Sequence, residues 1–219
     1  MILAVLALIL PQGLAVRGDV VHTMAGPAIP DGIVLVEGGR ITAVGSADEL
    51  AVPDGWRVLE AAVVVPGLVD ARSSVGLAGF LNIKHSNEEI ERSAPIQPEL
   101  SAVDAYNPRD PLVAWVRSFG VTAVNTGHAP GALISGQTMV VKTTGGTVAE
   151  ALVKPTACVT GSLGGGARSG KSPGTGSKAV AMLRQELIRA REYADRRARK
   201  AEGMDEEDDG ESGDAKPKG

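Results

Sequence analysis

The sequence predicts an α/β fold with a β-rich N-terminal part, and three observations carry that prediction. Short apolar runs separated by Gly, Pro and Asp fill residues 16–65, a pattern typical of an antiparallel sheet. Over residues 66–160 the pattern changes to strand, helix, strand. A helix over residues 178–201 and an acidic tail over 202–219 follow. With 219 residues, 43% of them hydrophobic, the chain is long and apolar enough to bury a core.

The β-rich part contains one clear hairpin. Two apolar runs, 33–37 and 40–44, flank the pair Gly38-Gly39, which can adopt the positive φ of a tight turn. The uninterrupted apolar run 61–66 predicts a strand buried on both faces, and so the entry to a parallel sheet.

The second part alternates between element types. Apolar residues at helical spacing predict a helix over 112–119, closed by Gly120, and a strand over 121–124 follows. Residues 132–142 read as a hairpin divided at Ser135-Gly136. The glycine-rich segment 161–177 has no apolar period and is expected to be a loop.

The first residues resemble a signal peptide. Nine apolar residues, 2–10, end at Pro11, far fewer than the roughly 20 that span a bilayer. Gly13 and Ala15 are small residues of the kind read at a cleavage site, which predicts a signal peptide over 1–15 and a periplasmic or secreted protein. Because no Lys or Arg precedes the apolar run, a mis-assigned start or a buried first strand, and with them a cytoplasmic location, remain alternatives.

Charge and composition exclude several classes. The helix over 178–201 has 8 basic and 3 acidic residues, and the tail over 202–219 has 8 acidic and 2 basic ones. Because the tail would compete for the basic face and aromatics make up only 3% of the chain, we expect a solvated helix and no nucleic-acid partner. A single cysteine, Cys158, excludes an internal disulfide and a CxxC zinc site.

Three segments together resemble a known family. They are VEGGRITAVG (36–45), VVVPGLVDARSSVGL (63–77) and FGVTAVNTGHAPGALISGQTMVVKT (119–143). In this order they resemble the metal-dependent amidohydrolases, especially the imidazolonepropionase-like branch, over residues 16–155. The resemblance implies a β-sandwich portion in 16–65, followed in 66–160 by the first units of a TIM-type (β/α)8 barrel. It also implies hydrolysis of non-peptide carbon–nitrogen bonds, such as those of cyclic amides, with a divalent metal such as zinc.

The chain departs from the family at the metal site. The resemblance places two metal-ligand histidines at the end of the first barrel strand, where this sequence has Arg72 and Ser74. An arginine has no free lone pair and a serine hydroxyl is a poor zinc ligand, so we expect no metal ligand at these positions. Arg72 could form an ion pair with Asp70 that plugs the barrel mouth, or could bind a substrate carboxylate.

The chain is also short for the family. A (β/α)8 barrel needs about 250 residues, whereas 66–201 contains 136. The sequence therefore predicts an incomplete barrel with exposed apolar edges, and either a homo-oligomer or a partner that completes the fold. Two functions stay open: a truncated amidohydrolase that is inactive alone, and a non-catalytic binding or scaffold protein with the same fold.

A small-molecule ligand is expected at four residues: Arg72, His128, Ser135 and Gln137. His128 follows a barrel-type strand, where barrel enzymes place site residues, although a loop histidine bonded to backbone is the alternative. Ser135 and Gln137 belong to a motif of the family, or to a plain turn.

Three further features have plainer interpretations. His22 and His85 are expected at the surface or in structural roles. Residues 165–172 match the phosphate-loop pattern GxxxxGKS around Lys171, but Pro173 interrupts the helix that such a loop needs, which favours a linker.

Overall fold

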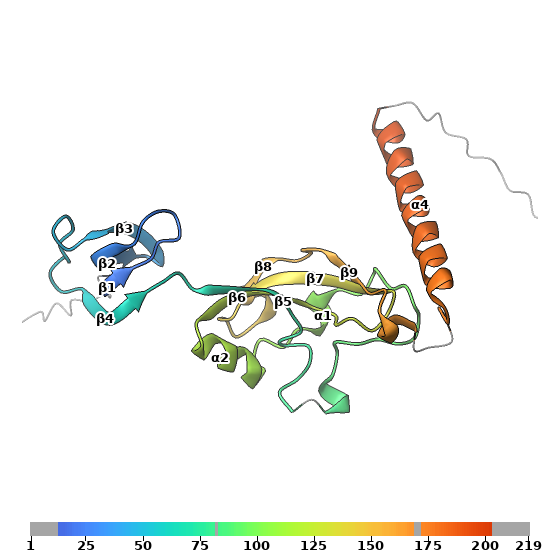
Figure 1. The fold of residues 1–219 in the computed structure, drawn as a ribbon, viewed down its shortest axis with the longest axis horizontal. Helices are drawn as coiled ribbons and strands as arrows, with labels where there is room; N and C mark the ends of the chain where they lie inside the picture. The colour runs from blue at the N-terminus through green and yellow to red at the C-terminus, as the bar shows by residue number, and fades with distance from the viewer. Residues whose placement is uncertain (1–12, 82, 169–171, 203–219) are drawn as a thin grey trace, which may run out of the picture. The chain divides into compact units, whose positions relative to one another are not determined.

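The computed structural model describes residues 13–81, 83–168 and 172–202. The chain divides into two compact units, residues 1–68 and 69–219, which are described separately (Figure 1). Part of the predicted signal peptide, the tail beyond residue 202 and Lys171 of the phosphate-loop match lie outside the described residues.

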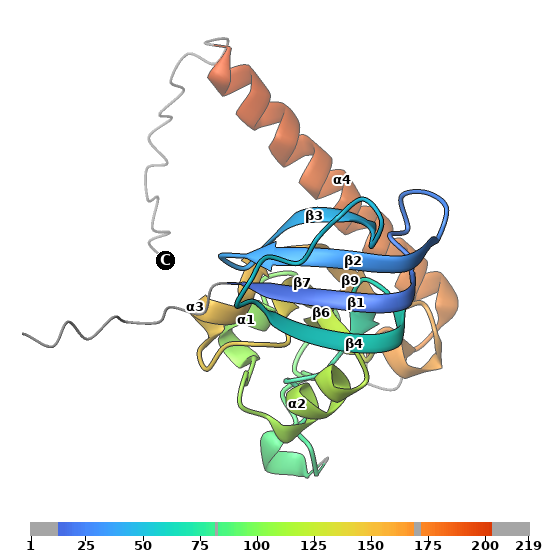
Figure 2. The same cartoon turned by 90° about the vertical axis from the view of Figure 1, so that its left-hand side faces the viewer.

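Unit 1 is a four-stranded sheet in the order β3-β2-β1-β4 (Figure 2). Its strands are β1 (Leu14–Val21), β2 (Ile29–Glu37), β3 (Arg40–Ser46) and β4 (Arg57–Val64). β1 pairs antiparallel with β2, and β2 pairs antiparallel with β3. β4 joins the other side of β1 in parallel.

The predicted hairpin is confirmed, and the predicted buried strand is not. Gly38 and Gly39 join β2 to β3 with φ values of 56° and 76°, a region that L residues avoid. β4 does pair in parallel, but it lies at the edge of the unit 1 sheet, and Val63 is 57% exposed. The expectation that 61–66 is buried on both faces is therefore wrong, because the described residues cover neither the edge nor the outer face of β4.

The two faces of this sheet differ. On one face Ala15, Ile33 and Leu35 are buried against apolar residues of the segment that leads to β4. On the other, Val16 lies between Val34 and Leu59 in the ladder, so the three side chains share a face. Leu59 and Val63 of that second face are 40% and 57% exposed. We call this second face, formed by Val16, Val20, Val34, Val44, Leu59 and Val63, the open face.

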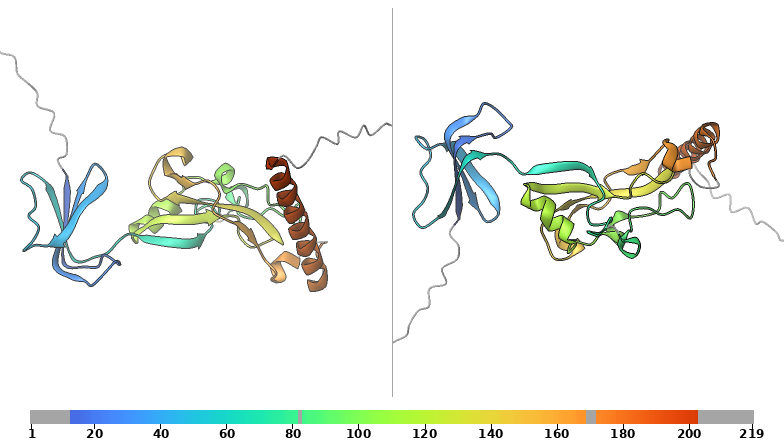
Figure 3. Two further views of the ribbon diagram at one scale, coloured as in Figure 1. Left: turned by 90° about the horizontal axis from the view of Figure 1, so that it is seen from above. Right: turned by 60° about the horizontal axis from the view of Figure 1, so that its bottom comes forward.

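Unit 2 contains the second sheet, in the order β5-β6-β7-β8, with β9 paired to β7. The green and yellow strands β6 and β7 lie side by side in Figure 3. β7 pairs antiparallel with β6, β8 and β9, whereas strands of a (β/α)8 barrel pair in parallel. The predicted α/β class is present, and the barrel units remain a prediction.

The elements of unit 2 are short apart from β7 and the last helix. The strands are β5 (Leu68–Ser73), β6 (Val121–Gly127), β7 (Ile134–Lys142), β8 (Leu152–Lys154) and β9 (Val159–Gly161). The helices are η1 (Lys84–Ser86), α1 (Ala102–Ala105), α2 (Pro111–Ser118), α3 (Val148–Ala151), η2 (Gly165–Arg168) and α4 (Gly176–Ala201).

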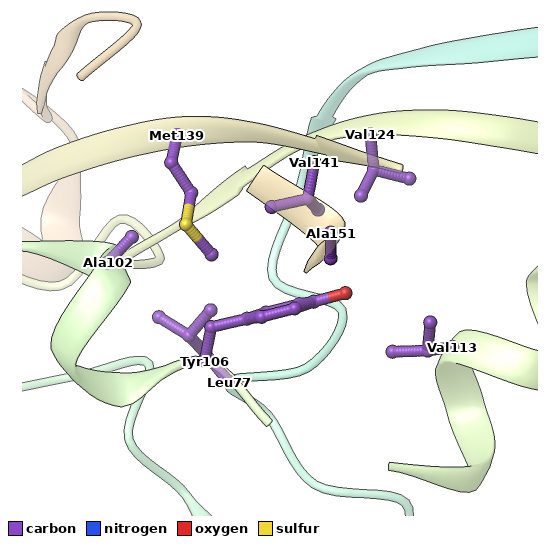
Figure 4. Packing of buried hydrophobic residues seen from close by; sticks show 8 residues of the cluster. All are labelled: Leu77, Ala102, Tyr106, Val113, Val124, Met139, Val141 and Ala151. Atoms are coloured by element: carbon purple, nitrogen blue, oxygen red, sulfur yellow. The ribbon is translucent and has the colours of Figure 1, made fainter. Parts of the chain in front are cut away.

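The core of unit 2 lies between the sheet and the short helices (Figure 4). Val124, Met139 and Val141, all 0% exposed, extend from β6 and β7. The ring of Tyr106 crosses the cluster opposite them. The other members are Leu77, Ala102, Val113 and Ala151. This core fixes β6 and β7, and with them the segments that follow each strand.

Local sequence signals set the residue at which α2 begins. The side chain of Asp110 caps α2 by accepting from the N–H of Leu112 at 2.8 Å, and Pro111 occupies the first turn.

The hairpin expected over 132–142 is wrong: these residues run into the single strand β7, and Gly136, with φ +125°, lies at a register shift against β9. The glycine makes an irregularity in a strand, not a turn.

α4 confirms the predicted helix, with its start two residues earlier. Thr175 caps it by accepting from the N–H of Lys178 at 3.3 Å. Ala179 is its buried residue, while Val180 and Leu187 on the apolar side are 45% and 62% exposed. Because the helix begins at Gly176, five residues beyond Lys171, it does not give the phosphate-loop geometry. Among the described residues no helix is both long and apolar enough to span a membrane.

Candidate functional site

Arg72, at the end of β5, binds backbone and not a carboxylate. Its Nη1 donates to the carbonyl of Ser73 at 2.5 Å, and its Nη2 donates to the carbonyl of His128. The side chain of Asp70 instead accepts from the backbone N–H of Arg72 at 3.0 Å. The expected Asp70–Arg72 ion pair is therefore wrong, because the guanidinium turns toward the segment that follows β6. This hydrogen bond links the end of β5 to the segment that follows the neighbouring strand, β6 (Val121–Gly127).

The residues at the family's ligand positions do not fit a zinc ion. The Arg72 guanidinium is a cation with no lone pair, and its donors already serve two carbonyls. Ser74 lies in a turn where its carbonyl accepts from the N–H groups of Leu77 and Ala78. Within the described residues, no group of three His, Cys, Asp or Glu side chains could hold a metal.

His128 is the most unusual of the predicted site residues. It is 5% exposed, and its carbonyl accepts from Arg72 and, at 3.5 Å, from the hydroxyl of Thr160. Its ring Nδ1 is buried without a hydrogen-bond partner. The ring fits there because residue 136 is glycine, where a Cβ would lie 2.8 Å from Nδ1. A buried polar atom without a partner is costly, so this ring is a candidate for ligand contact.

Ser135 and Gln137 have structural bonds in this structure. The Ser135 hydroxyl accepts from the backbone N–H of Ala132 at 3.4 Å and donates to the carbonyl of the same residue at 3.5 Å, which makes a local turn. Gln137 donates from its amide to the carbonyl of Pro98 at 3.0 Å and accepts from the hydroxyl of Thr156 at 2.8 Å. These bonds fix the segments on either side of β7.

The structure thus brings Arg72 and His128 into contact through the backbone carbonyl of His128. It also places Gly136 against the imidazole ring of His128. His22 and His85 are exposed, as expected.

A cleft of about 580 Å³ lies beside His128 and was not foreseen. Its carboxylates are Glu88, Glu91, Glu99 and Asp104, all exposed. Glu91 accepts from the N–H groups of Arg92 and Ser93 at 2.6 Å each, and the bonds to Ser93 and Arg92 lower the pKa of its carboxyl. The sequence signal was five acidic residues of irregular spacing within 88–104, which no motif joins and four of which line the cleft.

Tyr106 is a second buried group without a partner. Its hydroxyl forms no hydrogen bond within the described part of the chain. Burial in the core, with a smaller contribution from the charge of Asp110, raises its pKa to about 12. The phenol is therefore neutral at ordinary pH and belongs to the core, not to a catalytic site.

Comparison with known proteins places these features in context. A model of the bacterial imidazolonepropionase-like composite domain matches residues 34–51, which include most of the β2–β3 hairpin. Among curated proteins, none matches the chain. An amidohydrolase from Thermotoga maritima is similar in structure over 89% of this chain, with a TM-score of 0.77 and 23% identity. The chain spans about half of that protein, 52% of its length.

Two other solved structures match less of the chain. Molinate hydrolase is 30% identical over 31% of this chain and 15% of its own, with a TM-score of 0.28. A zinc-bound adenosine deaminase from Xanthomonas campestris is 18% identical over 54% of this chain and 29% of its own, with a TM-score of 0.31. At these scores neither supports an argument about this fold. Over most of its length the chain is therefore similar in fold to the Thermotoga maritima amidohydrolase, and residues 34–51 match the imidazolonepropionase-like composite domain model.

Proposed function

We propose that the chain is part of an amidohydrolase-like hydrolase that acts on non-peptide carbon–nitrogen bonds, of the cyclic amide type. The observation that supports this most is the match to the Thermotoga maritima amidohydrolase over 89% of this chain but 52% of that one. In this proposal, 16–65 is a β-sandwich portion and 66–160 holds the first barrel units. Any catalytic metal is held by residues outside those described.

A second candidate function is supported by Arg72. Its guanidinium is used to bind the carbonyls of Ser73 and His128, at the position where the resemblance expects a metal ligand. An arginine fixed in this way stabilises the strand ends and does not activate water. This supports a non-catalytic binding or scaffold protein, with a small-molecule ligand near His128.

The open face of unit 1 supports a partner. Leu59 and Val63 lie exposed on one apolar surface of the sheet, which a sandwich would cover with a second layer. We therefore propose that a further polypeptide, either a second copy or the remaining part of a hydrolase, completes the fold. We also propose export, with cleavage near Ala15.

Protein recovered from its own cells tests the two functions. Its intact mass is compared with 22.4 kDa, and its divalent metal content and its hydrolysis of five- and six-membered cyclic amides are measured. A larger mass, or a tightly bound second chain, with about one or two metal ions and turnover supports the hydrolase. Metal-free protein of 22.4 kDa or less, without turnover, supports the binding or scaffold function and refutes the hydrolase.

A further inference from the structure

The last helix, α4, is covered by the rest of unit 2 on one side only. Its buried and half-buried residues all lie near its start: Ala179, Met182, Leu183 and Glu186. Ala179, Met182 and Glu186 recur at helical spacing and therefore share one side of the helix. Every residue from 187 to 202 is exposed, and Figure 1 shows this part of α4 extending away from the sheet of unit 2.

The side of α4 that faces away from unit 2 carries an apolar groove. Its lining residues are Val180, Leu183, Arg184, Leu187, Ile188 and Arg191. Val180, Leu187 and Ile188 are 45%, 62% and 45% exposed. Because apolar side chains gathered on one exposed surface are typical of an interaction site, we expect this groove to be covered by a partner.

Two arginines lie among these apolar side chains. Arg184 and Arg191 are exposed, and neither belongs to an ion pair within the described part of the chain. An arginine can lay its aliphatic stem along an apolar surface and hold its guanidinium at the edge, where it can bind a phosphate. The groove therefore joins an apolar surface to two cations that are free to bind anions.

The charge of the whole helix indicates which partner fits. Residues 178–201 have 8 basic and 3 acidic side chains. A second copy of α4 would bring two positive helices together, which disfavours pairing of the helix with itself. An acidic peptide offers carboxylates at fixed positions, whereas the basic residues of α4 continue beyond the groove to Lys200. An anionic lipid surface offers anions at any spacing and an apolar interior beneath them.

We propose that α4 binds the surface of an anionic lipid bilayer. The helix lies in the plane of the interface, with Val180, Leu187 and Ile188 against the acyl chains and Arg184 and Arg191 at the lipid phosphates. α4 has 26 residues, a length common among helices that lie in an interface with one apolar and one basic side. This surface goes beyond the proposed hydrolase or scaffold function and is independent of both.

Co-sedimentation of the full chain with vesicles tests the proposal. The vesicles are an equimolar mixture of phosphatidylcholine and phosphatidylglycerol, compared with phosphatidylcholine alone. Leu187→Gln with Ile188→Gln removes two apolar side chains of the groove, and Gln keeps a good helix propensity. The matched control, Met24→Gln with Ile41→Gln, makes the same change at side chains of unit 1 that are 75% and 67% exposed. We expect the groove variant to bind the anionic vesicles at least about tenfold more weakly, and the control less than about twofold.

A second pair of variants tests the arginines. Arg184→Gln with Arg191→Gln removes the two cations of the groove. Its control, Arg196→Gln with Lys200→Gln, removes the same charge from the opposite side of the helix. We expect the first variant to weaken binding at least about tenfold and the control less than about threefold, because only the first pair reaches the phosphates directly.

Each outcome decides for or against the lipid surface. Binding to the anionic vesicles alone, weakened by both groove variants and accompanied by slower amide exchange in residues 180–191, supports it. Equal weakening by the groove variants and their controls would mean diffuse attraction and would overturn it, as would no binding of the unchanged protein. If the unchanged protein binds no vesicles but self-associates through Leu187 and Ile188, the groove belongs to a second copy and the lipid surface is refuted. None of these measurements depends on turnover, so the proposed hydrolase is tested separately.

Discussion

Gly136→Ala gives the sharpest test of the geometry around His128. At φ +125° an L residue is strained, by about 1–3 kcal/mol. The added Cβ would also lie 2.8 Å from His128 Nδ1 and 2.9 Å from the Leu100 Cβ, and such overpacking costs about 1–3 kcal/mol. The expected loss in the free energy of unfolding is therefore about 2–6 kcal/mol.

Gly38→Ala is the matched control. Gly38 also has a positive φ, 56°, but a Cβ there meets nothing within 4 Å, so only the backbone strain of about 1–2 kcal/mol applies. Because the chain has two units that could unfold separately, the assay is urea unfolding combined with amide hydrogen exchange in β7 for the first variant and in β2 for the second.

A double-mutant cycle isolates the contact with the ring. In a His128→Ala background the Gly136→Ala change loses one of its close contacts, so its cost should fall by about 0.5–2 kcal/mol. The reasoning is refuted if Gly136→Ala costs no more than Gly38→Ala, or if its cost is the same with and without the imidazole. The cycle remains informative if Gly136→Ala is too unstable to purify, because the double variant is then expected to fold better.

Three further outcomes are expected. Tyr106→Phe should match or exceed the stability of the parent protein, because the hydroxyl is buried without a partner. Since the unfolded phenol ionises near pH 10 and the folded one near 12, parent stability should fall over that range by at most about 1.4 kcal/mol per pH unit, and the variant should not show this fall in alkaline unfolding curves. Thr126→Val should cost about 1–3 kcal/mol in urea, since it removes the 2.7 Å bond to the carbonyl of Val75; a neutral effect would contradict this. Arg72→Met should cost about 1 kcal/mol and free the carbonyl of His128, yet leave the metal content of native protein unchanged; loss of metal would place Arg72 near a metal site.

Sequence reasoning succeeded where a local pattern decides the structure. Gly38-Gly39 predicted the hairpin because both positions need positive φ, and that requirement is local. The helix α2 was found from its apolar spacing, although its N-cap, Asp110, was not singled out. α4 followed in the same way from its period.

Sequence reasoning failed where a residue far away in the chain determines the local structure. Ser135-Gly136 has turn-forming residues, but pairing with β9 on one side and β6 on the other keeps β7 continuous. Arg72 has Asp70 two residues away, yet its guanidinium reaches the carbonyl of His128, 56 residues along the chain. The acidic cleft could not be predicted either, because its carboxylates converge only when irregular segments pack beside β6 and β7.

The position of Ala15 imposes an order of events on any export of this chain. Ala15 is 0% exposed and lies inside β1, paired with Leu35 on one side and Val58 on the other. A peptidase needs an extended, accessible chain at its cleavage site, and the folded sheet hides this one. If the proposed export is correct, cleavage near Ala15 must therefore come before β1 pairs with β2 and β4.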